Sequence, residues 1–225
     1  MTTLEIAVTC VQDAVNAVAG GAESVELSFN LAAGGLTPDH AVMQAVRDVL
    51  KIPMYVILRP HAESFRYTTA QIDGMLNDIR VMQSVGVDGV VFGAVDSDNK
   101  IDVGLMCQIA DASKPLPVTL HRALDGSREP ATALRALVGI VPRVLTSGPA
   151  ETAWIGRDGM KLWVEQFGQQ MQFVSSGSLT MAQLGDYIRW VKPHTVHLGS
   201  AAITNGIVDV EKVRQLKMIV EESGR

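Results

Sequence analysis

The feature of this sequence that most constrains its fold is a regular alternation of short strand-like runs with longer stretches of helical periodicity. Alternating β and α units indicate a parallel sheet whose consecutive strands are joined by helices. The predicted strands are Leu4–Val8, Ser24–Ser28, Met54–Arg59, Gly89–Phe92, Val118–His121, Arg143–Thr146, Gln172–Ser175 and Thr195–Leu198. The predicted helices are Val11–Ala19, Pro38–Val49, Thr69–Val85, Val103–Ala112, Glu129–Val138, Trp154–Phe167, Thr180–Val191 and Val208–Glu222.

A count of eight such units favours an α/β fold of the (β/α)8 TIM-barrel type, because eight parallel strands close on themselves. The alternative is an open doubly wound sheet, which would carry a Gly-x-Gly-x-x-Gly turn after its first strand. Residues Thr9–Gln12 do not match that turn. Since no linker or low-complexity segment interrupts the chain, we expect one compact TIM-barrel domain over residues 1–225, with tight loops.

Charge and composition exclude several classes of partner. The net charge of -5 leaves no basic surface for nucleic acid, and no apolar run is long enough to span a bilayer. Met1–Thr3 leads directly into a strand, without the charged start and apolar stretch of a secretory signal. Cys10 and Cys107 have no partner at a meaningful spacing, which favours a reducing cytoplasm over a disulfide framework.

The segment Glu26–Pro38, ELSFNLAAGGLTP, predicts a strand, a glycine-containing loop and the start of a helix. Thr37 is a suitable N-cap, and Pro38 suits the first helical position because its missing N–H is not needed there. Glu26 lies within the strand, where a carboxylate is costly to bury unless it is paired. A charged strand residue followed by such a loop indicates a functional site.

Strand parity places several polar side chains inside the predicted barrel. Because successive side chains of a strand point to opposite faces, the apolar positions assign Glu5, Glu26, Arg59, His121 and His197 to the interior. In a barrel, functional groups gather at the carboxyl ends of the strands. Arg59 is the expected partner of Glu26 and Glu5, since a buried carboxylate needs a cation and hydrogen bonds.

Three roles are open for these residues. Glu26 and His121 are candidate catalytic acid and base groups with Arg59 as their charge partner, because a histidine titrates near neutral pH. Glu26, His121 and His197 could instead hold a divalent ion, and a purely structural ion cluster that fixes the barrel register is the third interpretation. Further candidates for binding a ligand are Glu5, Arg122, Asp125 and His197.

The last three predicted strands end in small residues. Backbone N–H groups of such loops often bind phosphate in barrels, whereas glycines can also serve tight turns alone. We therefore expect a small anionic ligand, which includes phosphorylated metabolites, at this part of the mouth. The candidate residues are Ser147, Gly148, Gly177, Ser178, Gly199 and Ser200.

Several phrases of the sequence together resemble the CutC copper-homeostasis family. They are ELSFNLAAGGLTP (26–38), ILRP (57–60), DGVVFG (88–93), HRALD (121–125) and LTSG (145–148), in the order and spacing of that family. The resemblance implies a cytoplasmic (β/α)8 barrel, a homodimer or higher homo-oligomer, and a link to copper handling. It brings no well-established reaction, so whether the chain is an enzyme stays open.

The same resemblance bears on the metal. Family members commonly carry cysteines where this chain has Ala7 and Ser28, and some carry one where it has Arg66. A thiolate is the ligand that selects copper(I), so Cys10, after the first strand, is the one candidate metal ligand of that kind near the mouth. Two hypotheses follow: a module that binds or handles copper(I), or an enzyme that acts on a small anionic metabolite.

Overall fold

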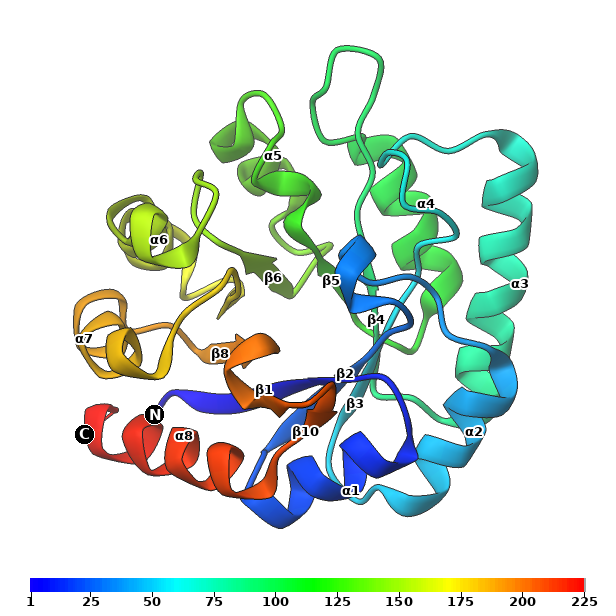
Figure 1. Ribbon diagram of the computed structural model, residues 1–225. Coiled ribbons are helices and arrows are strands. Elements are labelled where there is room, and N and C mark those ends of the chain that lie inside the picture. Colours follow the sequence, from blue (N-terminus) through cyan, green and yellow to red (C-terminus); the bar gives the residue numbers. More distant parts are fainter. Residues whose placement is uncertain (225) are drawn as a thin grey trace.

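Eight parallel strands close into a barrel in the computed structural model, which describes residues 1–224 (Figure 1). Neighbouring strands follow chain order, and the last strand hydrogen-bonds to the first, so the sheet has no edge. The (β/α)8 fold predicted from the sequence is therefore confirmed. The strands are β1 (Thr3–Val8), β2 (Ser24–Leu27), β3 (Met54–Ile57), β4 (Gly89–Phe92), β5 (Val118–Leu120), β6 (Arg143–Thr146), β7 (Gln172–Ser175) and β8 (Thr195–Leu198).

A helix follows each strand and lies on the outside of the barrel (Figure 1). Local sequence explains several of their starts: the Asp102 side chain accepts the Leu105 N–H, and Thr68 and Gln71 form a capping box. The helices are α1 (Val11–Gly20), α2 (His40–Val49), α3 (Thr69–Val85), α4 (Val103–Ser113), α5 (Pro130–Leu137), α6 (Ala153–Phe167), α7 (Met181–Val191) and α8 (Val210–Ser223).

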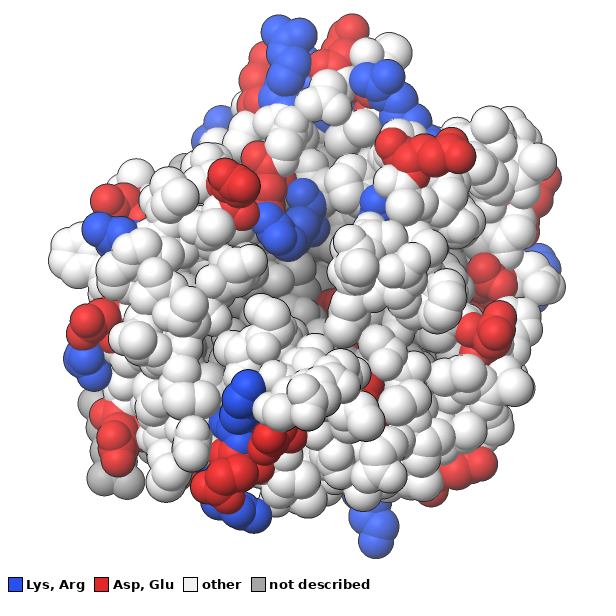
Figure 2. Space-filling view, viewed as in Figure 1, with Lys and Arg blue, Asp and Glu red and all other residues white. Residues whose placement is uncertain are grey.

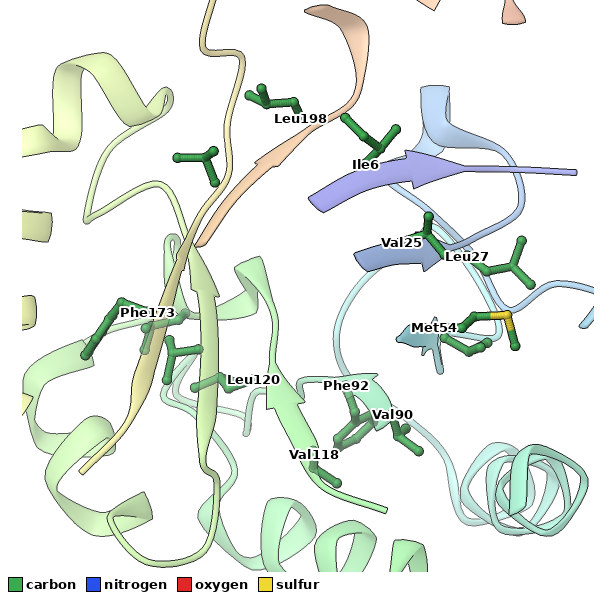
Figure 3. Packing of buried hydrophobic residues seen from close by; sticks show 14 of the residues in the cluster. Ile6, Val25, Leu27, Met54, Val90, Phe92, Val118, Leu120, Phe173 and Leu198 are labelled. Carbon is green, nitrogen blue, oxygen red and sulfur yellow. The ribbon is translucent and has the colours of Figure 1, made fainter. Parts of the chain in front are cut away.

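The main hydrophobic core is the layer between the strands and the surrounding helices. Outward-facing strand residues such as Ile6, Leu27 and Phe92 are fully buried there against helix residues such as Met43 and Met82. Figure 3 shows labelled members of this layer, among them Ile6, Leu27 and Phe92. Because the apolar side chains occupy this layer, the polar residues of the same strands are left to face the barrel interior.

The start of α2 differs from the sequence-based prediction. The helix begins at His40 with Asp39 at its N-cap, so the prediction of Thr37 as N-cap and Pro38 as first helical residue was wrong. The reason is that Thr37 has another partner: its Oγ1 accepts the backbone N–H of Arg59 at 2.8 Å. Thr37 thereby ties the loop after β2 to the end of β3.

Short elements that the sequence did not predict lie in the loops around the open end of the barrel. The 3-10 turns are η1 (Leu31–Ala33), which is the short blue coil over the barrel in Figure 1, η2 (Arg122–Leu124) and η3 (Ser200–Ala202). A two-stranded hairpin, β9 (Ile203–Thr204) and β10 (Ile207–Val208), precedes α8. None of the helices within residues 1–224 has the length and apolar character that crossing a bilayer requires.

Candidate functional site

A pocket of about 400 Å³ opens at the carboxyl ends of the strands. Figure 2 shows this face as a central hollow bordered mostly by uncharged residues, with a group of charged atoms at one side. Glu26 is the one carboxylate and Arg122 the one arginine among the lining residues. The pocket also contains eight of the residues that the sequence singled out: Glu26, His121, Arg122, Gly177, Ser178, His197, Gly199 and Ser200.

A fully buried ion pair lies beneath this pocket. Arg143 from β6 donates from Nη2 to Glu5 Oε2 of β1 at 2.6 Å, and its guanidinium lies 4.1 Å from the ring centre of Tyr55. Ser24 donates to the same Glu5 oxygen at 2.9 Å. Burial alone would raise the pKa of Glu5, but the charge of Arg143 and the hydrogen bond from His197 lower it to about 2.

Glu26 extends from β2 toward this ion pair and forms the charged part of the pocket floor. The residue is 7% exposed, and within residues 1–224 its buried Oε2 has no hydrogen-bond partner. Burial raises the pKa of Glu26 above its usual value. The positive charge of His197 acts in the opposite direction but is the smaller effect. A buried carboxyl without partners is rare in folded proteins, so this group is the most informative one in the pocket.

His197 of β8 connects the two carboxylates. Its Nδ1 lies 3.1 Å from Glu5 Oε1, and burial would lower its pKa, but Glu26 and Glu5 raise it. Ligand atoms of Glu5, Glu26 and His197 all lie within 4.8 Å of one another. The structure therefore groups Glu5, Glu26 and His197, whereas one alternative from the sequence was a group of Glu26, His121 and His197.

Arg59 is not the partner of Glu26 or Glu5, so that prediction was wrong. Its guanidinium instead donates to the carbonyl oxygens of Ala33, Gly35 and Ala62 at 3.0, 3.2 and 3.1 Å. Arg59 therefore joins the loops that follow β2 and β3, and it does not line the pocket. The long side chain lets it reach loop carbonyls beyond the end of its strand, which parity alone could not show.

His121, directly after β5, is held as a neutral imidazole. Its Nδ1 accepts the backbone N–H of Ala123 at 3.2 Å, and its ring packs against Phe65 with centres 4.9 Å apart. Burial, helped by the charge of Arg59, lowers the pKa of His121 to about 3. With Nδ1 used as an acceptor, the proton of the neutral ring lies on Nε2, which has no partner in the described part of the chain.

Arg122 supplies positive charge at the edge of the pocket. Asp125 accepts from Arg122 Nε at 2.6 Å, while the Oγ of Ser147 and the carbonyl oxygen of Glu151 accept from Nη2 at 3.3 and 3.1 Å. Asp125 also accepts the Ser147 hydroxyl at 2.7 Å. Asp125 and Ser147 therefore position Arg122 and do not line the pocket themselves.

The loops after β7 and β8 line the pocket through Gly177, Ser178, Gly199 and Ser200. Gly148, after β6, does not line it and instead packs against α6, where a Cβ atom would overlap the carbonyl oxygen of Gly156. Cys10 is exposed at the N-cap of α1 and is not among the lining residues. No sulfur atom lines the pocket.

Arg143, the cation of the buried cluster, was not predicted from the sequence. The signal was available, because Val144 faces the helices and the alternation along β6 then turns Arg143 inward. Phe65 was not predicted either. It lines the pocket from the loop after β3, and its ring packs at a tilt against the ring of His121. Phe65 lies outside any regular element, so no periodicity could have identified it.

Sequence comparison finds relatives over most of the chain. The profile of the CutC family matches residues 2–203. A human protein named copper homeostasis protein cutC homolog is 39% identical over 178 residues, which cover 79% of this chain and 65% of the human one. A Mesorhizobium japonicum protein named family protein CutC is 37% identical over 187 residues, 83% of this chain and 72% of its own length. This chain thus spans slightly less than two thirds of the human relative.

Solved structures share the fold. A putative copper homeostasis protein CutC from Streptococcus agalactiae superposes with a TM-score of 0.83 at 24% identity, covering 89% of this chain and 99% of its own. Phosphoribosylanthranilate isomerase from Thermotoga maritima gives a TM-score of 0.65 at 16% identity, with coverages of 99% and 100%. At these identities the similarity shows the barrel architecture alone.

Proposed function

This chain belongs to the CutC copper-homeostasis family, and from this we propose that it acts in copper homeostasis by binding a small anionic molecule in its barrel-mouth pocket. The observation that carries the proposal is the pocket itself. Its floor holds the unpaired carboxyl of Glu26, and its edge holds Arg122, fixed in place by Asp125. A carboxyl and a guanidinium that both line a cavity of about 400 Å³ suit a compact polar metabolite.

The proposed ligand carries its negative charge near Arg122 and the loops after β7 and β8. Arg122 is oriented before any ligand arrives, and its Nη1, which donates to no described residue, would donate to a phosphate or carboxylate oxygen. Gly177 lies beside it, since a Cβ there would be 3.7 Å from the guanidinium carbon. The other end of the ligand would reach Glu26 and so needs a hydrogen-bond donor.

Thermal shift and calorimetry test this proposal with inorganic phosphate, glycerol 3-phosphate and malonate as probes. We expect at least one probe to raise the melting temperature, and Arg122→Ala to remove that effect. Arg135→Ala is the matched control, because Arg135 lies on α5 outside the pocket. No shift with any of the probes, or an equal shift in Arg122→Ala, would count against an anion subsite at Arg122.

A second candidate function is acid–base catalysis on the same ligand, favoured by the free carboxyl of Glu26. Its raised pKa lets it hold a proton nearer to neutral pH than an ordinary glutamic acid does. The Nε2–H of His121 would then be a neutral hydrogen-bond donor, because this imidazole does not titrate near pH 7. Deuterium exchange from D2O into small phosphorylated ketones, followed by NMR and lost in Glu26→Gln, tests this candidate.

We also propose that the chain binds copper(I) directly. Relatives named copper homeostasis protein cutC homolog support this proposal. Cys10 is the thiol nearest the mouth by sequence, whereas Cys107 lies on α4. Anaerobic titration with copper(I) against a chromophoric chelator compares Cys10→Ala with the control Cys107→Ala. If only Cys10→Ala weakens binding, Cys10 is a ligand; if neither does, thiolate handling by this chain is excluded.

Two further proposals concern the setting of the protein. We propose a cytoplasmic location, supported by two cysteines that form no disulfide. We also propose self-association, supported by exposed apolar side chains of Ile155, Leu162 and Trp190 on the neighbouring helices α6 and α7. Fractionation of cells and light scattering of the purified chain measure these two properties.

A further inference from the structure

The carboxyl of Glu26 requires a compensating partner that the residues around it do not supply. It is buried beside a second carboxylate, Glu5, and receives no hydrogen bond within residues 1–224. By contrast, Oε2 of Glu5 is fully satisfied by Arg143 and Ser24. Two carboxyl groups so close together normally share a proton or a cation.

We propose that Glu5, Glu26 and His197 form a binding site for one divalent transition-metal ion at the floor of the pocket. This site goes beyond the anion-binding proposal, since its ligand is a cation and Glu26 is the one residue that the two proposals share. Two of the three residues, Glu26 and His197, line the pocket, so an ion can enter through the barrel mouth. The third, Glu5, offers Oε1, the oxygen that Arg143 does not hold.

The spacing of the donor atoms fits a shared ion. Glu5 Oε1 and His197 Nδ1 are 3.1 Å apart, and all three donor groups have ligand atoms within 4.8 Å of one another. Two ligands that each bind one ion at about 2.1 Å, at right angles, are about 3 Å apart. The 3.1 Å between Glu5 Oε1 and His197 Nδ1 is thus also the distance expected between two neighbouring ligand atoms of one ion. These two side chains would need to move little to bind it.

The donor chemistry selects the class of ion. One imidazole and two carboxylates suit Zn²⁺ or Cu²⁺, whereas copper(I) prefers the thiolate and thioether ligands that this pocket lacks. Three protein ligands also leave coordination positions open toward the cavity, as in sites where a metal meets a water or a ligand. The site would thus bind copper in its oxidised, divalent form.

Arg143 shapes this site from behind. It fixes the orientation of Glu5, as outer partners of metal-binding carboxylates commonly do. The positive charge of Arg143 also repels the ion. With His197 neutral, the charges of a divalent ion and Arg143 are larger by one than the combined negative charge of Glu5 and Glu26. We expect this excess to weaken binding of the ion alone and to be balanced when an anion occupies the pocket.

The ion and a catalytic proton compete for the same carboxyl. A Glu26 that binds the ion is a ligand and does not act as an acid or base, so the metal site and the acid–base candidate exclude one another. The two differ in what they need: the metal site needs Glu5, Glu26 and His197 together, whereas acid–base catalysis needs a metabolite.

The experiment uses the full-length protein stripped of metal with a chelator. Isothermal titration with Zn²⁺ is expected to show one site per chain, and electron paramagnetic resonance of the Cu²⁺ form is expected to show coupling to one nitrogen. Glu26→Gln and His197→Gln should each weaken binding at least about tenfold, which corresponds to roughly 1.4 kcal/mol. His40→Gln is the matched control, because His40 is an exposed histidine paired with Asp78 far from the pocket.

Circular dichroism and thermal unfolding show whether each variant is folded, and Glu26→Gln keeps the shape of the side chain. The proposal is overturned if no ion binds below millimolar concentration, or if both pocket variants bind as tightly as the unaltered protein. These titrations contain no organic anion, and the anion test contains no metal. Failure of one proposal is therefore seen separately from failure of the other.

Discussion

At the scale of single residues, the Glu5–Arg143 pair is expected to matter most for stability. Replacing Arg143 by Met would leave Glu5 fully buried without its cation, which typically costs about 3–5 kcal/mol. Urea unfolding at pH 7 measures this loss. The double variant Glu5→Gln with Arg143→Met should lose less than Arg143→Met alone, because neither of the two altered positions then carries a charge. Equal losses in the two variants would contradict this account.

His121 makes a pH-dependent contribution whose sign follows from its lowered pKa. The folded protein resists protonation of His121 until about pH 3, whereas the unfolded chain takes up the proton near the ordinary histidine value. Stability is therefore complete at high pH and is lost as the pH falls through that interval. Between pH 7 and pH 4, protonation linked to His121 should lower the free energy of unfolding by roughly 3 kcal/mol, and the His121→Gln variant should not show this part of the decrease. Urea unfolding at several pH values measures it, with the exposed His40→Gln as a control that should retain the full loss.

At the scale of elements, the contact between α6 and the loop after β6 depends on the absence of side chains. A Cβ at Gly156 would overlap the carbonyl oxygen of Ser147, whereas a Cβ at Gly74 of α3 meets nothing within 4 Å. We expect Gly156→Ala to destabilise the protein and Gly74→Ala to stabilise it by about 1 kcal/mol, as alanine favours helices. Thermal unfolding of both variants tests the contrast, and a neutral Gly156→Ala would show that the loop can move away.

The accuracy of the sequence-based predictions also differs between elements, for physical reasons. The eight strands of the barrel and the eight α-helices of the described residues were anticipated, because burial of one face imposes a period on each of them. The hairpin β9–β10 was missed, since strands of two residues carry no period. The start of α2 was misplaced because Thr37 binds Arg59, and local capping preference says nothing of that distant partner.

The candidate site was predictable to a similar degree. Parity brought Glu5, Glu26 and His197 into one interior, and the structure places them within reach of one another. Parity could not assign ion-pair partners, because these depend on side-chain length and on the loops. That is why Arg59 was paired wrongly, whereas the inward position of Arg143 does follow from parity and was overlooked.

At the scale of the whole molecule, closure of the barrel brings β1 and the end of α8 side by side, so Thr2 and Gly224 lie close together (Figure 1). A Cβ at Gly224 would lie 3.5 Å from the backbone nitrogen of Thr2. A circular permutant that joins these ends through a short Gly/Ser linker and opens the chain after the exposed Gly139 should therefore fold. Circular dichroism and urea unfolding measure the result, with a loss of no more than a few kcal/mol expected. A permutant opened at Gly34 instead should lose the shape of the mouth.

The bonds of Arg59 also have an evolutionary consequence. Its guanidinium reaches the loop carbonyls only because Gly34 and Gly35 adopt positive φ angles of 83° and 86°, and a Cβ at Gly34 would lie 3.2 Å from Nη1. The arginine and the glycine pair are thus parts of one fitted contact, 24 positions apart in sequence. We expect them to co-vary among homologous sequences: lineages that replace the arginine should also be released from the requirement for the glycines.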